Sequence, residues 1–388
     1  MSKDLKPIKH IISNMFYSNL NNLITKNDNS KVTKVFEKAI PDDALNLFHQ
    51  IVNNFLKNKD IIVKGGRSLN KILNIYNETE IQYTDYDLYS KNPKEDLLKI
   101  GKELVDSGIK EVTVENIIFK PEIFRLTLFG IPLIDVEPVT IREYNKLPKY
   151  KDNDILYIEQ SFQKIDMYSQ FGRPTILNIS NWEKVHPKLK ELNKIKCYES
   201  KLKEKNTKIN SMVGKILDLL DNDCVLTGNI AYYQQMESYQ KQVYFPDLEY
   251  IEIFTHKIDK YVKLMKKFDN ITVKENNGFM NILTKYTVVY YLDKPIFYLY
   301  YIDDCINYDY IDGRMYSTYN HLMFYYNMIN FFEQSDEVDT LMYYLHLKLD
   351  NKELHTNFFG NRNPGIMGLH GMFVKKRKDT ELVKIINF

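Results

Sequence analysis

The chain of 388 residues has few cysteines, few glycines and one tryptophan, and it has no long uninterrupted apolar run. Its three cysteines, Cys197, Cys224 and Cys305, are odd in number and widely separated, which argues against disulfides and against zinc. No apolar stretch reaches the roughly 18 residues that a membrane-spanning helix needs, and the opening MSKDLKPIKH contains no apolar signal core. These absences predict a soluble protein of a reducing, cytoplasmic compartment.

The chain also lacks a large excess of positive or negative charge. Lys and Arg number 53 and Asp and Glu 51, for a net charge of +2. A field over the whole molecule therefore does not call for a nucleic-acid partner, and any RNA contact must come from a local basic segment. The run VKKRK at 374–378 is one candidate, although such a run is more typical of a solvated tail. A glycine-punctuated segment over 360–371 suggests no mechanism.

One segment joins a short apolar run to two glycines. Residues 60–66, DIIVKGG, predict a strand that ends in a glycine turn. The following RSLNKILNIY predicts a helix with Leu69, Ile72 and Leu73 on its buried face. The backbone N–H groups at the start of such a helix form a site for phosphate oxygens.

Three aspartates lie inside apolar runs that predict strands. Asp85 and Asp87, on a predicted strand over 81–90, project from one face because residues two apart in a strand point the same way. Asp135, on a predicted strand over 131–139, can meet them if the two strands are neighbours. Carboxylates near a core are strongly disfavoured unless cations meet them. The pattern therefore predicts a pair of divalent ions, Mg²⁺ or Mn²⁺.

The remaining pattern is that of a mixed α/β domain. Asp42 or Asp43 is the expected N-terminal cap of the first helix. The other predicted elements are helices over 41–58, 94–108 and 155–171, a charged helical connector over 185–222, and strands over 108–120 and 123–130.

The second half of the chain repeats this plan weakly. DNDCVLTGNIAYYQQM, LEYIEIFTH and KPIFYLYYI follow one another in the order of the three motif segments of the first half. In this alignment the three aspartates are replaced, in chain order, by Tyr250, Glu252 and Tyr298. We therefore expect two domains, a catalytic one over 1–184 and a degenerate copy over 185–388.

A glycine turn, an Asp-x-Asp strand and a third acidic strand in this order resemble the DNA polymerase β-type nucleotidyltransferase superfamily. Within it, the chain is most similar to the poly(A) polymerase catalytic subunits of poxviruses and related large cytoplasmic DNA viruses. KGGRSLNKIL, TDYDLY, IPLIDVEPVT and SFQKIDMYSQF carry this similarity, over roughly residues 60–175. The resemblance implies an α/β nucleotidyltransferase domain followed by a degenerate nucleotidyltransferase-like domain.

The resemblance also implies roles for particular residues. The catalytic and metal-binding residues would be Asp85, Asp87 and Asp135. The nucleotide contacts would come from Gly65, Gly66, Arg67, Ser68, Lys164 and Tyr168. Gly66 departs from the family, in which many relatives have serine, so a hydroxyl contact must come from Ser68 or be absent.

Several of these residues have a competing interpretation. Lys164 and Tyr168, four apart on a predicted helix, would grip the triphosphate and stack on adenine, but a surface lysine beside a half-buried tyrosine is commoner. Arg67 would reach phosphate or the primer backbone, and the competing interpretation is a plain exposed arginine on a helix. Glu137 lies on the face of Asp135 and would support the metal ions, unless it is a solvated glutamate at a strand end.

The implied activity is that of a polynucleotide adenylyltransferase. Such an enzyme adds AMP from ATP, without a template, to the 3′-hydroxyl of mRNA by a two-metal mechanism and so forms a poly(A) tail. An oligoadenylate or cyclic nucleotide synthase and a non-catalytic RNA-binding subunit are the alternatives. The expected partners are the mRNA 3′ end, ATP, and a second copy or a separate processivity subunit, with no membrane. The expected location is the host cytoplasm or viral factory, or the virion.

Overall fold

The computed structural model describes most of the chain between residues 40 and 349, together with two short strands nearer the C-terminus. The described residues are 40–76, 85–117, 120–173, 176–195, 198, 200, 208–236, 243–280, 282–302, 305–349, 358–359 and 386–387. The basic run at 374–378, the segment over 360–371 and Cys197 lie outside them.

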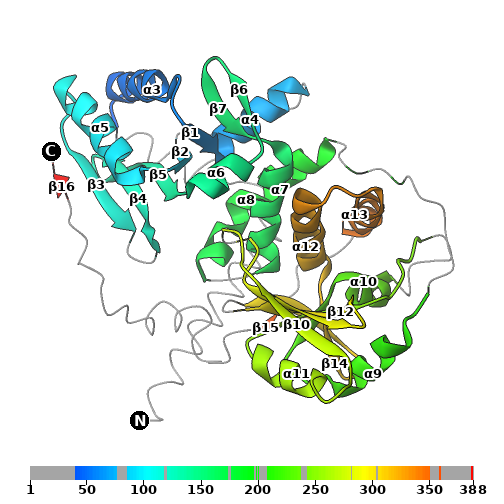
Figure 1. Cartoon of the computed structure of the whole chain (residues 1–388). Coiled ribbons are helices and arrows are strands. Elements are labelled where there is room, and N and C mark those ends of the chain that lie inside the picture. Colours follow the sequence, from blue (N-terminus) through cyan, green and yellow to red (C-terminus); the bar gives the residue numbers. More distant parts are fainter. Residues whose placement is uncertain are drawn as a thin grey trace, which may run out of the picture. The chain divides into compact units, whose positions relative to one another are not determined.

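The chain forms two compact units (Figure 1). Among the described residues, the N-terminal unit takes those within 40–163 and 183–195 and the strand at 386–387. The C-terminal unit takes those within 164–182 and 196–359. The two units therefore exchange short segments on either side of residue 184, where the sequence predicts a single boundary.

The N-terminal unit is built on one mixed sheet. Its strand order is β16-β3-β4-β5-β2-β1-β7-β6. The strands are β1 (Ile61–Lys64), β2 (Tyr86–Ser90), β3 (Val112–Ile117), β4 (Lys120–Leu128), β5 (Ile131–Pro138), β6 (Lys149–Asp152), β7 (Ile155–Ile158) and β16 (Ile386–Asn387). The helices are α3 (Asp42–Leu56), α4 (Gly65–Ile75), α5 (Pro93–Asp106) and α6 (Ile141–Lys146). Helix α7 (Gln160–Gly172) leads out of the unit, and α8 (Ile176–Lys194) leads back into it.

Alternation along the strands separates a core face of this sheet from a polar one. Tyr86 and Leu88 of β2 join a buried apolar cluster that includes residues of α3 and α5. Asp87, which lies between them, is only partly buried and projects the other way. The predicted orientation of the Asp-x-Asp strand is therefore confirmed for Asp87.

The C-terminal unit repeats seven of the eight strands of the N-terminal sheet in the same order, and among the described strands only β16 and β15 lack a counterpart. Its order is β10-β11-β12-β9-β8-β14-β13-β15, so β8 occupies the place of β1, β9 that of β2 and β12 that of β5. The relative directions of the strands agree as well. Strand β8 pairs antiparallel with β9, as β1 does with β2, and β9 pairs parallel with β12, as β2 does with β5. The predicted duplication is confirmed, and the fold is a mixed α/β one with a second unit built on the same plan.

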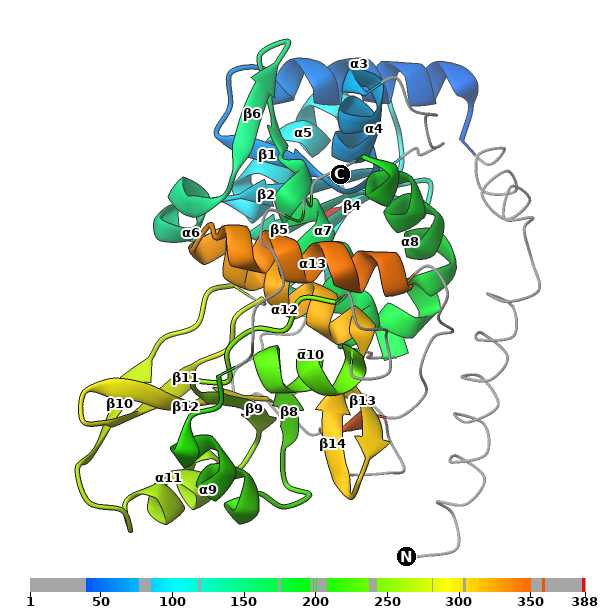
Figure 2. The same ribbon diagram turned by 90° about the vertical axis from the view of Figure 1, so that its right-hand side faces the viewer.

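The elements of the C-terminal unit follow in the corresponding chain order. The strands are β8 (Val225–Thr227), β9 (Ile251–Thr255), β10 (Ile271–Asn276), β11 (Tyr286–Tyr291), β12 (Lys294–Tyr301), β13 (Ile306–Ile311), β14 (Arg314–Ser317) and β15 (Phe358–Phe359). The helices are α9 (Ser211–Leu219), α10 (Gly228–Met236), α11 (Ile258–Met265), α12 (Tyr319–Phe332) and α13 (Asp336–Leu349). Helices α12 and α13 pack side by side (Figure 2).

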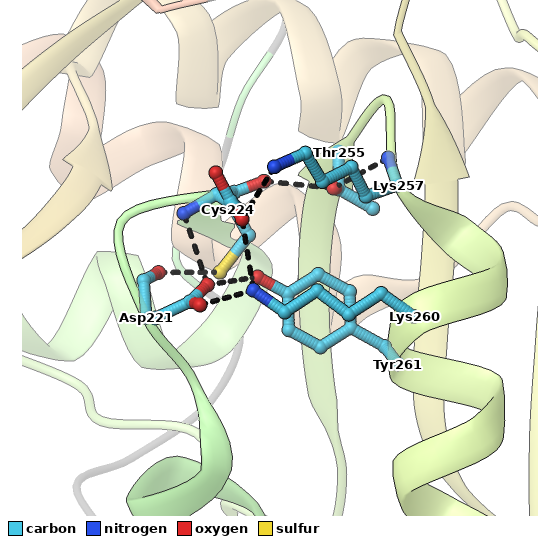
Figure 3. Close-up of polar contacts among 7 residues, drawn as sticks. Asp221, Cys224, Thr255, Lys257, Lys260 and Tyr261 are labelled. Atoms are coloured by element: carbon cyan, nitrogen blue, oxygen red, sulfur yellow. Dashed lines mark hydrogen bonds and ion pairs between the residues drawn. The ribbon is translucent and has the colours of Figure 1, made fainter.

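A polar cluster ties the start of β8 to helix α11 in the C-terminal unit (Figure 3). Lys260 pairs with both Asp221 and Asp223, and the Tyr261 hydroxyl donates to Asp221 at 2.7 Å. The Cys224 thiol donates to the carbonyl of Asp221, and burial raises the pKa of this thiol to about 12. A thiol with that pKa stays protonated and unreactive, so this cluster anchors two elements.

Two local predictions need correction. Residues 155–158 form strand β7, parallel to β1, and the helix predicted over 155–171 begins only at Gln160. The first helix is preceded by Pro41, and Asp42 and Asp43 lie in its first turn instead of capping it. Their charge still suits the positive end of the helix dipole. None of the helices in the described part of the chain is long and apolar enough to cross a membrane.

Candidate active site

The glycine turn between β1 and α4 lies directly against Asp87. Gly65 has φ of +64°, a left-handed conformation that glycine adopts without strain. A Cβ at Gly65 would stand 2.1 Å from Oδ2 of Asp87, so no other residue fits there without a shift. Helix α4 begins at Gly65, and the first N–H groups of a helix have no partner within it. The predicted strand, glycine turn and helix are confirmed.

Five charged residues form one row across five adjacent strands of the N-terminal unit. Lys64 of β1 pairs in register with Asp87 of β2, and Asp87 pairs with Asp135 of β5. Asp135 pairs with Arg125 of β4, and Arg125 with Glu115 of β3. The two aspartates therefore occupy adjacent positions in the sheet, as the sequence predicts, with a cation on each side.

Arg125 binds the carboxylate of Asp135 through two nitrogens of its guanidinium group. Its Nε donates to Oδ1 and its Nη2 to Oδ2, each at 2.7 Å. This bidentate geometry is the strong form of the arginine–carboxylate pair. The hydrogen bond to Asp135 raises the pKa of the Arg125 guanidinium further, so it is charged at any working pH.

Asp87 is the residue of this row whose pKa is shifted most clearly by its surroundings. Burial and the neighbouring charge of Asp85 raise the pKa of the Asp87 carboxyl to about 6, while Lys64 and Lys188 of α8 act in the opposite direction. A carboxyl whose pKa is raised by burial and by a neighbouring charge is typical of a functional position. Cations that approach this point stabilise the ionised form.

Lys64 is a member of the site that the sequence motif did not single out. Its ammonium lies 2.5 Å from Oε2 of Glu137 and 4.2 Å from the centre of the Tyr89 ring. Glu137 therefore has a cation partner, and its interpretation as a solvated strand-end glutamate is wrong. A metal-supporting role of Glu137 stays a prediction.

In the described part of the chain, the acidic side chains do not form a closed metal cage. Among the described residues, no three His, Cys, Asp or Glu side chains form a group arranged to hold one. The reason is visible at Asp135, whose two oxygens face Arg125. The donor chemistry nonetheless fits magnesium, which binds through one or two carboxylates together with substrate phosphates and seldom in an all-protein cage.

The residues after the glycines are engaged inside the protein. Ser68 is fully buried, and its hydroxyl donates to the carbonyl of Ile158 at 2.8 Å. Arg67 is partly buried, and its Nε donates to the carbonyl of Asp85 at 3.0 Å. The plain exposed arginine is therefore the wrong interpretation of Arg67. Contact of either residue with phosphate stays a prediction.

Lys164 and Tyr168 belong to the C-terminal unit. Lys164 is 1% exposed, with its ammonium 4.5 Å from the centre of the Tyr198 ring, and Tyr168 is fully buried. The interpretation of a surface lysine beside a half-buried tyrosine is thus wrong. Their contact with the nucleotide stays a prediction.

The second unit carries an altered version of the same site. Gly228 repeats the left-handed conformation of Gly65 with φ of +60°, and its Cβ would stand 1.6 Å from Oε2 of Glu252. Glu252 pairs in register with Thr227 on one side and Tyr298 on the other. The positions of Lys64 and Asp135 have therefore lost their charge, and the predicted correspondence of Asp87 with Glu252 and of Asp135 with Tyr298 is confirmed.

Tyrosine side chains surround the carboxyl of Glu252 in the altered site. The hydroxyl of Tyr325 donates to Oε1 of Glu252, and that of Tyr300 approaches the same oxygen at 3.5 Å. Burial raises the pKa of the Glu252 carboxyl to about 7. Tyr250, which replaces the first aspartate, packs its ring 5.1 Å from that of Tyr298. This unit therefore offers one buried carboxyl where the N-terminal unit offers three aspartates.

A mixed sheet with a glycine turn against an Asp-x-Asp strand and a third aspartate in register defines a nucleotidyltransferase-type fold. Residues 50–176 match the family described as "Poly(A) polymerase catalytic subunit", and they include the glycine turn and all three aspartates. The resemblance to this family that the sequence motifs indicate is thereby confirmed.

A solved structure shares the fold of the whole chain. The crystal structure of the Megavirus polyadenylate synthase superposes with a TM-score of 0.70 at 16% sequence identity, over 100% of this chain and 86% of that one. No curated protein matches the sequence. The family match covers residues 50–176, and the structural match shows that the fold is shared.

Proposed function

We propose that this protein is a template-independent polymerase that transfers AMP from ATP to the 3′-hydroxyl of RNA. The observation that carries the proposal is the register of Asp87 with Asp135 beside a glycine turn that closes on Asp87. The family match over residues 50–176 supports adenylate transfer in particular.

In the proposed reaction the 3′-oxygen of the RNA forms a bond to the α-phosphorus of ATP. The bond from that phosphorus to the oxygen bridging to the β-phosphate breaks, pyrophosphate leaves, and the hydroxyl proton passes to solvent. Magnesium or manganese, held jointly by Asp85, Asp87, Asp135 and the triphosphate, would lower the pKa of the hydroxyl and neutralise the leaving group.

The residues of the chain orient the reactants. The N–H groups at the start of α4, which have no partner within the helix, are favourable to anionic ligands, so Gly65 and Gly66 would hold the triphosphate. Lys64 and Arg125 balance the carboxylates from both sides of the row. Their charges limit the repulsion between the carboxylates and an anionic substrate.

The direct test incubates the protein with an RNA oligonucleotide, Mg²⁺ and each of the four labelled nucleoside triphosphates. A ladder of products with ATP supports a polymerase. A cyclic or short unprimed product would instead identify an oligoadenylate or cyclic nucleotide synthase, and RNA binding without any product a non-catalytic subunit. Light scattering on the same sample tests for a homodimer.

A further inference from the structure

Arg67 connects three parts of the N-terminal unit. Its Nε donates to the carbonyl of Asp85 at 3.0 Å, and its Nη2 lies 3.0 Å from Nδ1 of His49 on helix α3. The guanidinium carbon lies 3.5 Å from the centre of the Tyr86 ring. A stacked, forked guanidinium of this kind is geometrically fixed in a way that a lysine ammonium is not.

Asp85 lies where the sheet no longer fixes the backbone. Strand β2 begins at Tyr86, its register with β5 starts at the same residue, and its register with β1 ends at Asp87. The side chain of Asp85 is exposed. The hydrogen bond from Arg67 therefore acts on the one proposed metal ligand that stands outside the strand ladder.

The groups behind Arg67 are themselves fixed. The Tyr86 hydroxyl donates to Oδ1 of Asn53 at 3.0 Å, and the rings of Phe48 and His49 each lie 5.8 Å from that of Tyr86. His49 accepts from Arg67 only as a neutral imidazole. Burial and the charge of Arg67 lower its pKa to about 4, so this form predominates at neutral pH.

We propose that Arg67 is a positioning residue, which, backed by His49 and Tyr86, fixes the backbone of Asp85 and so holds its carboxylate beside Asp87. The inference rests on the proposed function, because it assigns Asp85 to the metal site. It replaces contact with phosphate as the principal role of Arg67. Groups that orient metal ligands typically change metal affinity by 10–100-fold when they are removed.

The test measures Mn²⁺ affinity in the absence of nucleotide, from the electron paramagnetic resonance signal of free Mn²⁺. Arg67→Met keeps an apolar stem over Tyr86 and removes the donors, while Arg67→Lys keeps the charge and removes the fork. Both variants are expected to bind Mn²⁺ at least about tenfold more weakly than the parent protein. His49→Phe keeps the ring and removes Nδ1, and we expect a smaller loss in the same direction.

The direction of the change in Mn²⁺ affinity distinguishes a positioning role of Arg67 from a purely electrostatic one. If Arg67 acts only through its charge, its removal brings Mn²⁺ closer to the carboxylates and tightens binding, which would overturn the inference. Unchanged Mn²⁺ affinity with a raised KM for ATP would also overturn it and identify a phosphate contact. Asp85→Asn is the reference: if Asp85→Asn does not weaken Mn²⁺ binding, the metal assignment in the proposed function fails first.

Discussion

The carboxylate of Asp87 closes so tightly on Gly65 that a Cβ at the glycine would stand 2.1 Å from Oδ2. The same relationship recurs between Gly228 and Glu252 in the second unit, at 1.6 Å. One backbone arrangement is thus retained in both copies, although the charges around it are retained in only one. The turn is a property of the fold, and the row of charges is what separates the two units.

Replacing Gly65 by alanine is expected to reduce primer extension by about 100-fold or more. The new methyl group displaces Asp87 from its position, and misplacement by about 1 Å has that scale of effect on a reaction. The matched control is Gly130→Ala, because Gly130 also has a positive φ, of +72°, but nothing lies within 4 Å of its Cβ. Comparable losses of activity in both variants would show that backbone strain, not the contact with Asp87, is responsible.

Ser68→Ala is expected to lower the free energy of unfolding by about 1–3 kcal/mol, because it leaves the buried carbonyl of Ile158 without its donor. The KM for ATP should change little if the hydroxyl acts only within the protein. Denaturant unfolding and steady-state kinetics measure the two effects separately. A raised KM with unchanged stability would instead assign Ser68 to the phosphate, as the family resemblance implies.

Glu252 is expected to make the stability of the second unit depend on pH. Its carboxyl has a pKa of about 7 in the folded chain against 4.5 as the ordinary value, so the folded state binds the proton more tightly. Its contribution to stability is complete below about pH 4.5 and is lost as the pH rises towards about 7, by about 3 kcal/mol. Glu252→Gln keeps the shape of the side chain and should remove this part of the pH dependence in denaturant titrations at pH 5 and pH 7.5. An identical pH dependence in the variant would contradict the assignment.

The sequence pattern was enough to predict the parts of the site that depend on local structure. The glycine turn and the orientation of Asp87 follow from strand alternation and apolar runs, whereas the pairing of Asp87 with Asp135 was predicted only on the condition that β2 and β5 are neighbours, which the structure supplies. The partners across the sheet do not, because the register of β4 on β5 depends on an irregularity between Leu126 and Thr127. Arg125 could therefore not be assigned to Asp135 from sequence, although its place between apolar residues of a strand was a usable signal.

Short apolar segments were the second source of error. The run ILYI at 155–158 is equally consistent with a helix and with a buried strand, and only its pairing with β1 decides for the strand. Asp85 illustrates the opposite problem, since the predicted strand includes it and the observed strand begins one residue later. Asp85 therefore lies just before the strand ladder, where its carbonyl accepts the hydrogen bond from Arg67.

The measurement that tests the central claim most directly is single-nucleotide addition to an RNA primer by Asp87→Asn, Asp135→Asn and Glu252→Gln, with Mg²⁺ and with a chelator. All three variants keep the shape of the side chain they replace. The account predicts that each aspartate variant loses at least about 100-fold in rate, equivalent to about 3 kcal/mol of transition-state stabilisation. It also predicts that the chelator abolishes the parent activity and that Glu252→Gln stays near the parent rate. More than about a tenth of parent activity in a folded aspartate variant, or collapse of activity in a folded Glu252→Gln, would contradict it.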